Sequence, residues 1–120
     1  LEFVGVAPLS AAEIRMPGPC VATWKLPPNA DGVSCEVVLP EAFRDWGDCE
    51  VVIGASSRAD GTAPTDVWRG RVNAERPVAT VSADLPAGSA TLVVRVEPGE
   101  RGPVQDRPTL AFALIRVSAR

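Results

Sequence analysis

The residues from Trp24 to Trp68 alternate short apolar segments with turn-forming segments, and this alternation constrains the fold more than any other feature of the chain. In the segment from Val33 to Pro40, apolar side chains occupy every second position, and Ser34 and Glu36 lie between them. A period of two is typical of a strand with one face in the core and the other in solvent. The pattern therefore predicts an antiparallel sheet.

Similar segments recur along the chain at spacings of roughly 8 to 12 residues, which is typical of a β-sandwich or jelly roll. No long helical pattern separates them, so a βαβ architecture is not expected. We predict an all-β protein, an antiparallel β-sandwich or jelly roll of about eight strands over residues 20–120, with an N-terminal arm over residues 1–19. After a short segment at Glu2–Val6, the predicted strands are Cys20–Leu26, Val33–Pro40, Cys49–Ser56, Asp66–Asn73, Val78–Asp84, Ala90–Glu97 and Thr109–Ser118.

The arm carries apolar side chains of its own. Within it, Ser10 and Glu13 have the spacing of a helical capping box, and the Pro17-Gly18-Pro19 segment ends any helix that starts there. Two arrangements of the arm stay open: it folds back on its own sheet, or it lies on a neighbouring subunit.

Length and charge exclude several classes of function. At 120 residues the chain fits a single domain with its own core. The net charge is −3 and the basic residues are scattered, which argues against a nucleic-acid partner. No apolar run approaches the roughly 20 residues of a membrane span, and no signal peptide is visible. We expect a virion or a cytoplasmic assembly location, and secretion of a processed precursor stays open.

Cys20, Cys35 and Cys49 are odd in number and lack the spacing of a zinc site. If the strands that carry Cys35 and Cys49 form a hairpin, Cys35 lies opposite Gly54. At about 3.3 Å per residue, the two sulfur atoms are then roughly 15 Å apart, which is too far for a disulfide. This geometry predicts buried thiols and favours a reducing compartment.

The chain has no histidine, the side chain used most often for proton transfer near neutral pH. It also lacks a Gly-x-Ser-x-Gly elbow, so we predict no enzymatic activity and no cofactor. Acidic residues in loops could supply oxygen ligands to calcium, but their spacing does not match an EF-hand, and no metal site is predicted. These acids are Asp45, Asp48, Glu50, Asp60 and Asp66.

The chain has three tryptophans and no tyrosine. Trp24 and Trp68 lie on alternating strands and are predicted core residues. Trp46 lies in a charged loop, where an aromatic ring beside polar groups can hold a sugar. The other interpretation is that Trp46 closes the open end of the sandwich. The candidate glycan site consists of Trp46, Asp45, Asp48 and Arg44.

The segment Thr109–Ser118 is apolar on both faces, which is typical of a central strand or of a strand that meets another subunit. Together with the arm it offers more apolar surface than one small sandwich easily buries, and a closed homo-oligomer would cover that surface. The alternative is that arm and strand complete a monomeric core. The predicted oligomer interface consists of Phe3, Ile14, Met16, Leu110, Phe112 and Leu114.

Hydrophobic and turn residues follow one another in a set order through most of the chain. They are Trp24, Leu26-Pro27, Leu39-Pro40, Trp46-Gly47, Gly61, Val67-Trp68 and the final Leu114-Ile115-Arg116-Val117. In this order, residues 24–118 resemble small jelly-roll-like β-sandwich domains of phage and prophage virion proteins. The resemblance includes neither the arm nor the cysteines. It implies a structural or assembly role, commonly as trimers on a particle.

The resulting hypothesis is a non-catalytic, self-associating structural module of a phage or phage-like particle. Its partners would be copies of itself, with a trimer favoured, or other particle proteins. The alternative is a carbohydrate-binding accessory module that uses the Trp46 loop to hold a glycan. A third hypothesis, an adaptor domain cut from a larger enzyme, rests only on the absence of an initiator methionine.

Overall fold

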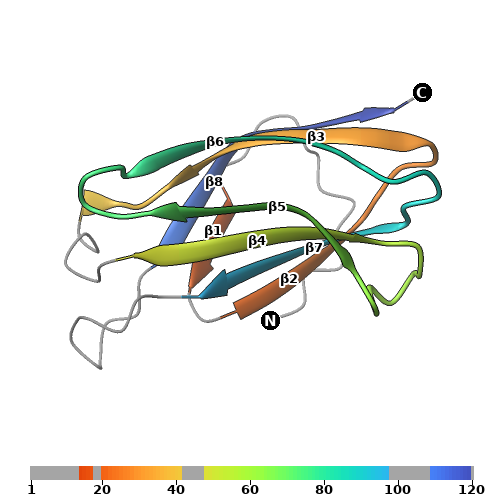
Figure 1. Cartoon of the computed structure of the whole chain (residues 1–120), viewed down its shortest axis with the longest axis horizontal. Coiled ribbons are helices and arrows are strands. Elements are labelled where there is room, and N and C mark those ends of the chain that lie inside the picture. Colours follow the sequence, from red (N-terminus) through yellow and green to blue (C-terminus); the bar gives the residue numbers. More distant parts are fainter. Residues whose placement is uncertain (1–13, 18–19, 42–47, 98–108, 120) are drawn as a thin grey trace.

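Eight antiparallel strands form two four-stranded sheets that pack face to face in the computed structural model, which describes residues 14–17, 20–41, 48–97 and 109–119 (Figure 1). Sheet I has the order β1-β8-β3-β6, and sheet II has the order β2-β7-β4-β5. This is the strand order of an eight-stranded jelly roll, so the predicted fold class is confirmed. The strands are β1 (Ile14–Pro17), β2 (Cys20–Lys25), β3 (Ala30–Val38), β4 (Cys49–Ser56), β5 (Thr65–Val72), β6 (Val78–Asp84), β7 (Thr91–Glu97) and β8 (Thr109–Ala119).

The main boundary error concerns β3, which begins at Ala30, three residues earlier than predicted. The Asp31-Gly32 pair therefore belongs to the strand instead of a turn. The turn lies just before it, because Asn29 adopts a positive φ of 61°, a conformation that asparagine tolerates. Pro27 and Pro28 also precede the strand and cannot donate hydrogen bonds to a neighbouring strand.

β3 and β4 lie in opposite sheets, so the predicted hairpin between them is wrong. Cys35 pairs with Val81 of β6, and Cys49 pairs with Val72 of β5. Alternation along a strand reports which face is buried, but it does not report which strand lies beside it. Both cysteines are buried thiols, so the predicted burial of these thiols is confirmed, although the hairpin from which it was argued does not form.

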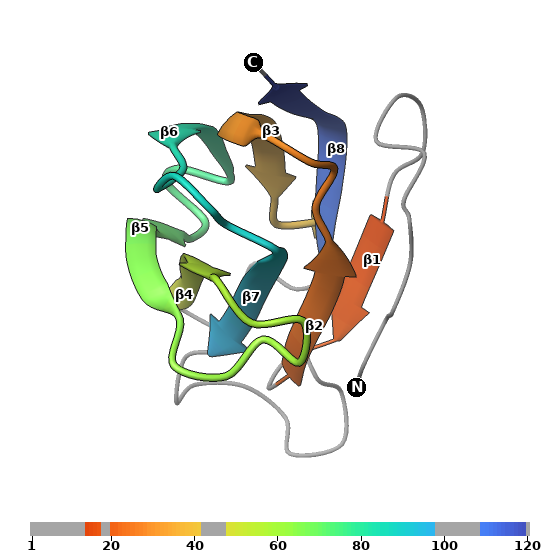
Figure 2. The same cartoon turned by 90° about the vertical axis from the view of Figure 1, so that its right-hand side faces the viewer.

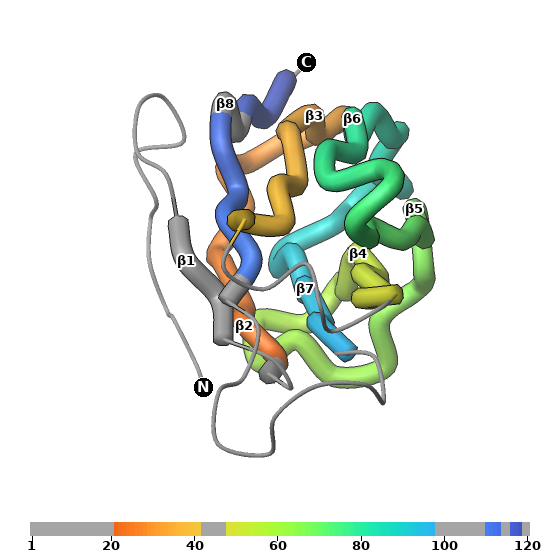
Figure 3. The backbone as a smooth tube through the Cα atoms, turned by 90° about the vertical axis from the view of Figure 1, so that its left-hand side faces the viewer, coloured from red at the N-terminus to blue at the C-terminus, as the bar shows by residue number. Residues whose placement is uncertain are grey.

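The core lies between the inner faces of the two sheets, which Figure 3 shows as two layers. Along β3, Cys35 and Val37 are buried, while Ser34 and Glu36 are half-buried on the outer face. β4 departs from this alternation, because Val52 on its outer face is also buried, at 3% exposure. Sheet II is therefore covered on part of both faces.

Two of the three tryptophans lie among the described residues, and both contact the core. Trp24 on β2 is 7% exposed, which confirms its predicted place. Trp68 on the edge strand β5 is half-buried and packs against the core from the rim. Its ring lies over Gly70, where an added Cβ would come within 2.6 Å of Trp68 Cζ2. Glycine at position 70 therefore leaves room for the indole at the sandwich edge.

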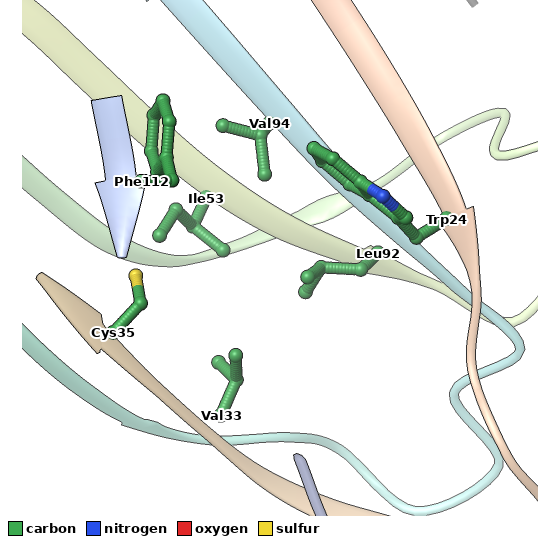
Figure 4. A pocket seen from close by; sticks show the side chains of 7 residues that line it. All are labelled: Trp24, Val33, Cys35, Ile53, Leu92, Val94 and Phe112. Atoms are coloured by element: carbon green, nitrogen blue, oxygen red, sulfur yellow. The ribbon is translucent and has the colours of Figure 1, made fainter. Parts of the chain in front are cut away.

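A small apolar cavity of about 20 Å³ lies inside the core, and side chains from both sheets point into it (Figure 4). The space fits about one water molecule but offers it no strong polar partner, so we expect it to be dry. Burial, together with the charge of Glu36, raises the pKa of the Cys35 thiol to about 11. The cavity is lined by Trp24, Val33, Cys35, Ile53, Leu92, Val94 and Phe112.

The described part of the N-terminal arm is a strand of sheet I. Residues Ile14–Pro17 form β1, which pairs antiparallel with β8 of the same chain. A helix ending at Pro17 is therefore excluded for these four residues, because their backbone pairs with β8 and covers its edge. The capping-box residues Ser10 and Glu13 lie outside the described residues.

Candidate functional site

The connections β2–β3, β4–β5 and β6–β7 gather at one end of the sandwich, at the right of Figure 1. Figure 2 views the molecule from this end and shows the β4–β5 connection running toward β2. The three segments border a groove of about 440 Å³, which we call the end groove. Sites for small ligands occupy roughly 300–1,000 Å³. Its described lining residues are Thr23, Trp24, Lys25, Leu26, Pro27, Pro28, Asn29, Ala59, Gly88, Ser89, Ala90 and Thr91.

The β2–β3 turn forms an apolar wall of the end groove. Pro27 and Pro28 are both exposed there, and neither can extend β2 because a proline nitrogen carries no hydrogen. The Ala30 N–H donates to the Pro27 carbonyl at 3.3 Å and closes the turn. Asn29, in the left-handed conformation, brings an exposed amide side chain to the same wall.

Buried hydroxyl groups hold the β4–β5 connection against the sheet. Ser56 Oγ donates to the carbonyl of Thr62 at 2.6 Å and accepts from the N–H of Arg58 at 3.1 Å. Thr91 Oγ1 lies 2.7 Å from the carbonyl oxygen of Arg58 and 3.2 Å from that of Ala59, and the two carbonyl groups share its single proton in a bifurcated hydrogen bond. Because Ser56 and Thr91 are almost fully buried, these hydrogen bonds are shielded from water.

Gly61 lies in the same connection and contacts the outer face of sheet II. Its φ is 75°, and an added Cβ would lie 3.3 Å from a methyl group of each of Thr23, Thr91 and Val93. Val93 is 5% exposed although it points away from the core. The connection therefore covers the outer face beside the end groove.

The β6–β7 turn forms a further wall. The N–H and Oγ of Ser89 both donate to the carbonyl of Pro86, at 3.2 and 2.6 Å. The Ala90 N–H donates to the Ser56 carbonyl at 2.7 Å, and the Ala90 carbonyl accepts from the Leu26 N–H at 2.9 Å. Ala90 thus joins the ends of β4 and β2, and the walls of the end groove are fixed by backbone hydrogen bonds.

Lys25 is the single lysine of the chain, and it lines the end groove as an exposed residue opposite Thr91 of β7. Among the described residues, no carboxylate lies within ion-pairing distance of its amine. None of the described lining residues is acidic. The groove therefore combines apolar proline rings, the Asn29 amide, the Ser89 hydroxyl and one cation, which can bind a polar ligand with an apolar face.

Only one residue of the predicted glycan site lies in the described part of the chain. Asp48 is exposed, accepts a hydrogen bond from Asn73 Nδ2 at 2.8 Å and lies 3.7 Å from Arg71 Nη1. Asp48 precedes β4, whereas the end groove lies beyond the other end of that strand. The remaining members, Trp46, Asp45 and Arg44, lie outside the described residues.

Leu110 and Phe112 are 0% and 2% exposed within the single chain. This burial corrects their predicted place at an oligomer interface, because the core of the chain already covers both side chains. In β1, Ile14 pairs with Phe112 and Met16 pairs with Leu110 through the backbone. Phe3, and the side chains of Ile14, Met16 and Leu114, lie outside the description.

Asp45, one of the acids considered for calcium, lies outside the described residues, and the described ones contact arginine or their own loop. Asp66 lies 3.4 Å from Arg69 and 3.8 Å from Arg95. Asp60 accepts hydrogen bonds from the N–H and the hydroxyl of Thr62, and these hydrogen bonds lower the pKa of Asp60. Within residues 14–17, 20–41, 48–97 and 109–119, no three such ligands form a group that could hold a metal ion. No helix in these ranges is long and apolar enough to cross a membrane.

A second groove of about 440 Å³ lies on the outer face of sheet I. Gly32, Ser34 and Ser82 form its floor across β3 and β6, and the exposed charges of Arg116 and Asp84 flank it. Its outward-pointing residues are small or polar. It therefore lacks the apolar wall that the end groove has.

Sequence reasoning missed the end groove. Its residues come from three separate segments, which the β2–β7 pairing and the hydrogen bonds of Ala90 bring together. One local signal was available: the single lysine stands directly before Leu26-Pro27-Pro28. A lone cation beside two prolines marks a charged and rigid surface turn.

No protein-family model and no curated protein matches the chain. Among solved structures, one described as "CBM4 structure and function" is similar, with a TM-score of 0.45 and 15% sequence identity. The similarity covers 83% of this chain and 59% of that chain, so this chain spans less than two thirds of that structure's length. Nothing about a ligand is carried over at this level of similarity, and the candidate site stands on the residues of this chain.

Proposed function

We propose that the chain is a non-catalytic binding module that holds a carbohydrate in the end groove. The observation that supports this proposal most is the groove itself, which is of ligand size and has walls held by hydrogen bonds from three chain segments. Because those hydrogen bonds are made within the protein, binding needs little ordering of the walls.

The groups in the end groove match the two kinds of surface that a sugar presents. The C–H face of a sugar ring packs on flat apolar groups, which the exposed rings of Pro27 and Pro28 provide. Sugar hydroxyls need donors and acceptors at the rim. The Asn29 amide supplies both, and the Ser89 oxygen can accept while its proton is directed to Pro86.

The same inventory supports binding without cleavage. Glycoside hydrolysis uses two carboxyl groups that flank the scissile bond. None of the described residues that line the end groove carries a carboxyl group, and the chain has no histidine. A sugar held there would meet none of the paired carboxyl groups that glycoside hydrolysis uses among these residues.

Binding can be tested by native affinity electrophoresis through gels that contain neutral or acidic polysaccharides, followed by calorimetry with the oligosaccharides of any retarding polymer. Asn29→Gly removes the amide but keeps the positive φ that the turn requires. Trp46→Ala removes the aromatic group of the originally predicted site. The proposal requires retardation that Asn29→Gly weakens and Trp46→Ala leaves unchanged. The reverse pattern would move the site to the Trp46 loop, and no retardation in any gel would reject a carbohydrate function.

A second candidate function, self-assembly on a phage-like particle, keeps support from one different surface. On the outer face of sheet I, Val38 of β3 pairs with Val78 of β6, which places two apolar side chains next to each other. Val78 is 49% exposed. We propose the surface around this valine pair, in place of Leu110 and Phe112, as the contact face if the chain assembles. Light scattering after size exclusion should then show a closed oligomer, and a monomer at all concentrations would reject this second function.

A further inference from the structure

We propose that the glycan held in the end groove is acidic, and that Lys25 binds its carboxylate or sulfate group. This inference rests on the carbohydrate function proposed above and narrows its ligand class. Both anions are delocalised oxygen groups, and the lysine ammonium recognises them as a compact point charge.

The distribution of charge around Lys25 supports an anionic ligand. The chain as a whole is acidic, with 15 acidic and 12 basic side chains. On the outer face of sheet II, Arg69 and Arg95 each lie within 4 Å of Asp66, and Arg71 lies 3.7 Å from Glu50. Those arginine charges are offset by neighbouring carboxylates.

Lys25 differs from these arginines, because no described carboxylate pairs with it and no described lining residue of its groove is acidic. The end groove is therefore a positive site on a negative protein. An anionic ligand bound there is attracted by the Lys25 ammonium group, whose charge no described carboxylate offsets. A neutral sugar leaves the ammonium group without a charged partner.

Lys25 is placed so that its charge can act on a ligand in the end groove together with the groove's apolar wall. It is the last residue of β2, and its backbone is held in the ladder opposite Thr91. The next residue, Leu26, is buried, and its N–H donates to Ala90. The ammonium group therefore projects from a fixed backbone beside the Pro27 and Pro28 rings, so one sugar residue can contact the rings and the cation together.

The test uses polysaccharides that differ in charge alone: polygalacturonate with its methyl ester, and chondroitin sulfate with desulfated, carboxyl-esterified chondroitin. We expect at least one charged member to bind roughly ten- to a hundredfold more tightly than its neutral counterpart, the range of a charge-assisted hydrogen bond. Lys25→Gln should abolish this preference and Lys25→Arg should keep most of it. Arg116→Gln, which removes an exposed cation on sheet I, is the matched control and should change nothing.

The outcomes separate this inference from the function on which it rests. If neutral polymers bind as tightly as charged ones, and Lys25→Gln binds like the wild type, the acidic ligand class is wrong and the carbohydrate function stands. If no polymer of either kind binds, both fall. If Arg116→Gln weakens binding as much as Lys25→Gln does, the attraction is a general charge effect and Lys25 is not the recognition residue. Raising the salt concentration should weaken only the charged pairings.

Discussion

At the scale of single residues, the buried thiol of Cys35 should make the stability of the fold decrease as the pH rises through the alkaline range. Its pKa is raised from 9.0 to about 11 in the folded chain, so the unfolded chain loses this proton first as the pH rises. The stabilisation is complete below about pH 9 and is lost as the pH approaches 11. Between about pH 8 and 10.5 the free energy of unfolding should fall by roughly 2 kcal/mol through this group.

Cys35→Val removes the titrating group and keeps an apolar side chain in the cavity. Urea unfolding of both proteins at the two pH values should show a shallower decline for the valine variant. The chain has no tyrosine, so thiolate absorbance in a parallel titration is free of tyrosinate. Equal pH slopes for the two proteins would show that Cys35 does not control alkaline stability.

The side chain of Thr91 helps to hold the β4–β5 connection, which borders the end groove. Its hydroxyl donates to two carbonyl groups of the β4–β5 connection at a site that is 2% exposed. Thr91→Val keeps the shape of the side chain but removes the hydroxyl donor. The Arg58 carbonyl still accepts from the Gly61 N–H at 3.1 Å, so we expect the loss of one ordinary hydrogen bond, about 0.5–1.5 kcal/mol in the free energy of unfolding. Thr80→Val, at an exposed position on β6, should cost almost nothing by the same urea assay. Equal costs would mean that the connection is not held through Thr91.

At the scale of elements, the contact of the β4–β5 connection with sheet II can be measured with two glycines. Gly61 and Gly88 both have positive φ, 75° and 80°, so alanine at either position meets a similar backbone cost of about 1 kcal/mol. An added Cβ at Gly61 meets three methyl groups at 3.3 Å, whereas one at Gly88 meets nothing within 4 Å. Gly61→Ala should therefore lower the melting temperature more than Gly88→Ala. Equal shifts would indicate that the connection does not rest on the sheet.

The strands were predictable because apolar side chains alternate with polar ones along most of them, which shows that one face is buried. β6, for example, begins and ends at the predicted residues. The partners of the strands were not predictable, because a jelly roll places strands that are consecutive in the chain, such as β3 and β4, in different sheets. Thr109–Ala119 shows the same limit. Its two apolar faces predicted either a central strand or an interface, and only the pairing with both β1 and β3 decides for the central strand.

The end groove escaped prediction for a related reason. Alternation describes strands, whereas this site is built from the connections between them. Ala90 contacts β2 and β4 through backbone hydrogen bonds, which carry no signature in side-chain identity. The polar connection 57–64 offered a turn signal, but only the hydroxyl groups of Ser56 and Thr91 make it a wall of the groove.

At the scale of the whole molecule, substitutions at Phe112 and Val78 test the two faces of sheet I, the inner one in the core and the outer one on the surface. Phe112 is 2% exposed and lines the cavity between the sheets, whereas Val78 is 49% exposed on the edge strand β6. Phe112→Asp places a carboxylate in the core without a cation among its cavity neighbours, so we expect the folded state to be lost. Val78→Asp should leave the free energy of unfolding within about 0.5 kcal/mol of wild type.

Near-ultraviolet circular dichroism and light scattering on both variants distinguish a core role from an interface role. A folded but dissociated Phe112→Asp protein would contradict the assignment of this side chain to the single-chain core. Val78→Asp tests the outer face instead, because it places a charge beside Val38 on the surface of sheet I. If the wild type is an oligomer and Val78→Asp is a folded monomer, the outer face of sheet I is the contact. If Val78→Asp leaves an oligomer intact, its subunits meet at another surface and the valine pair is not the contact.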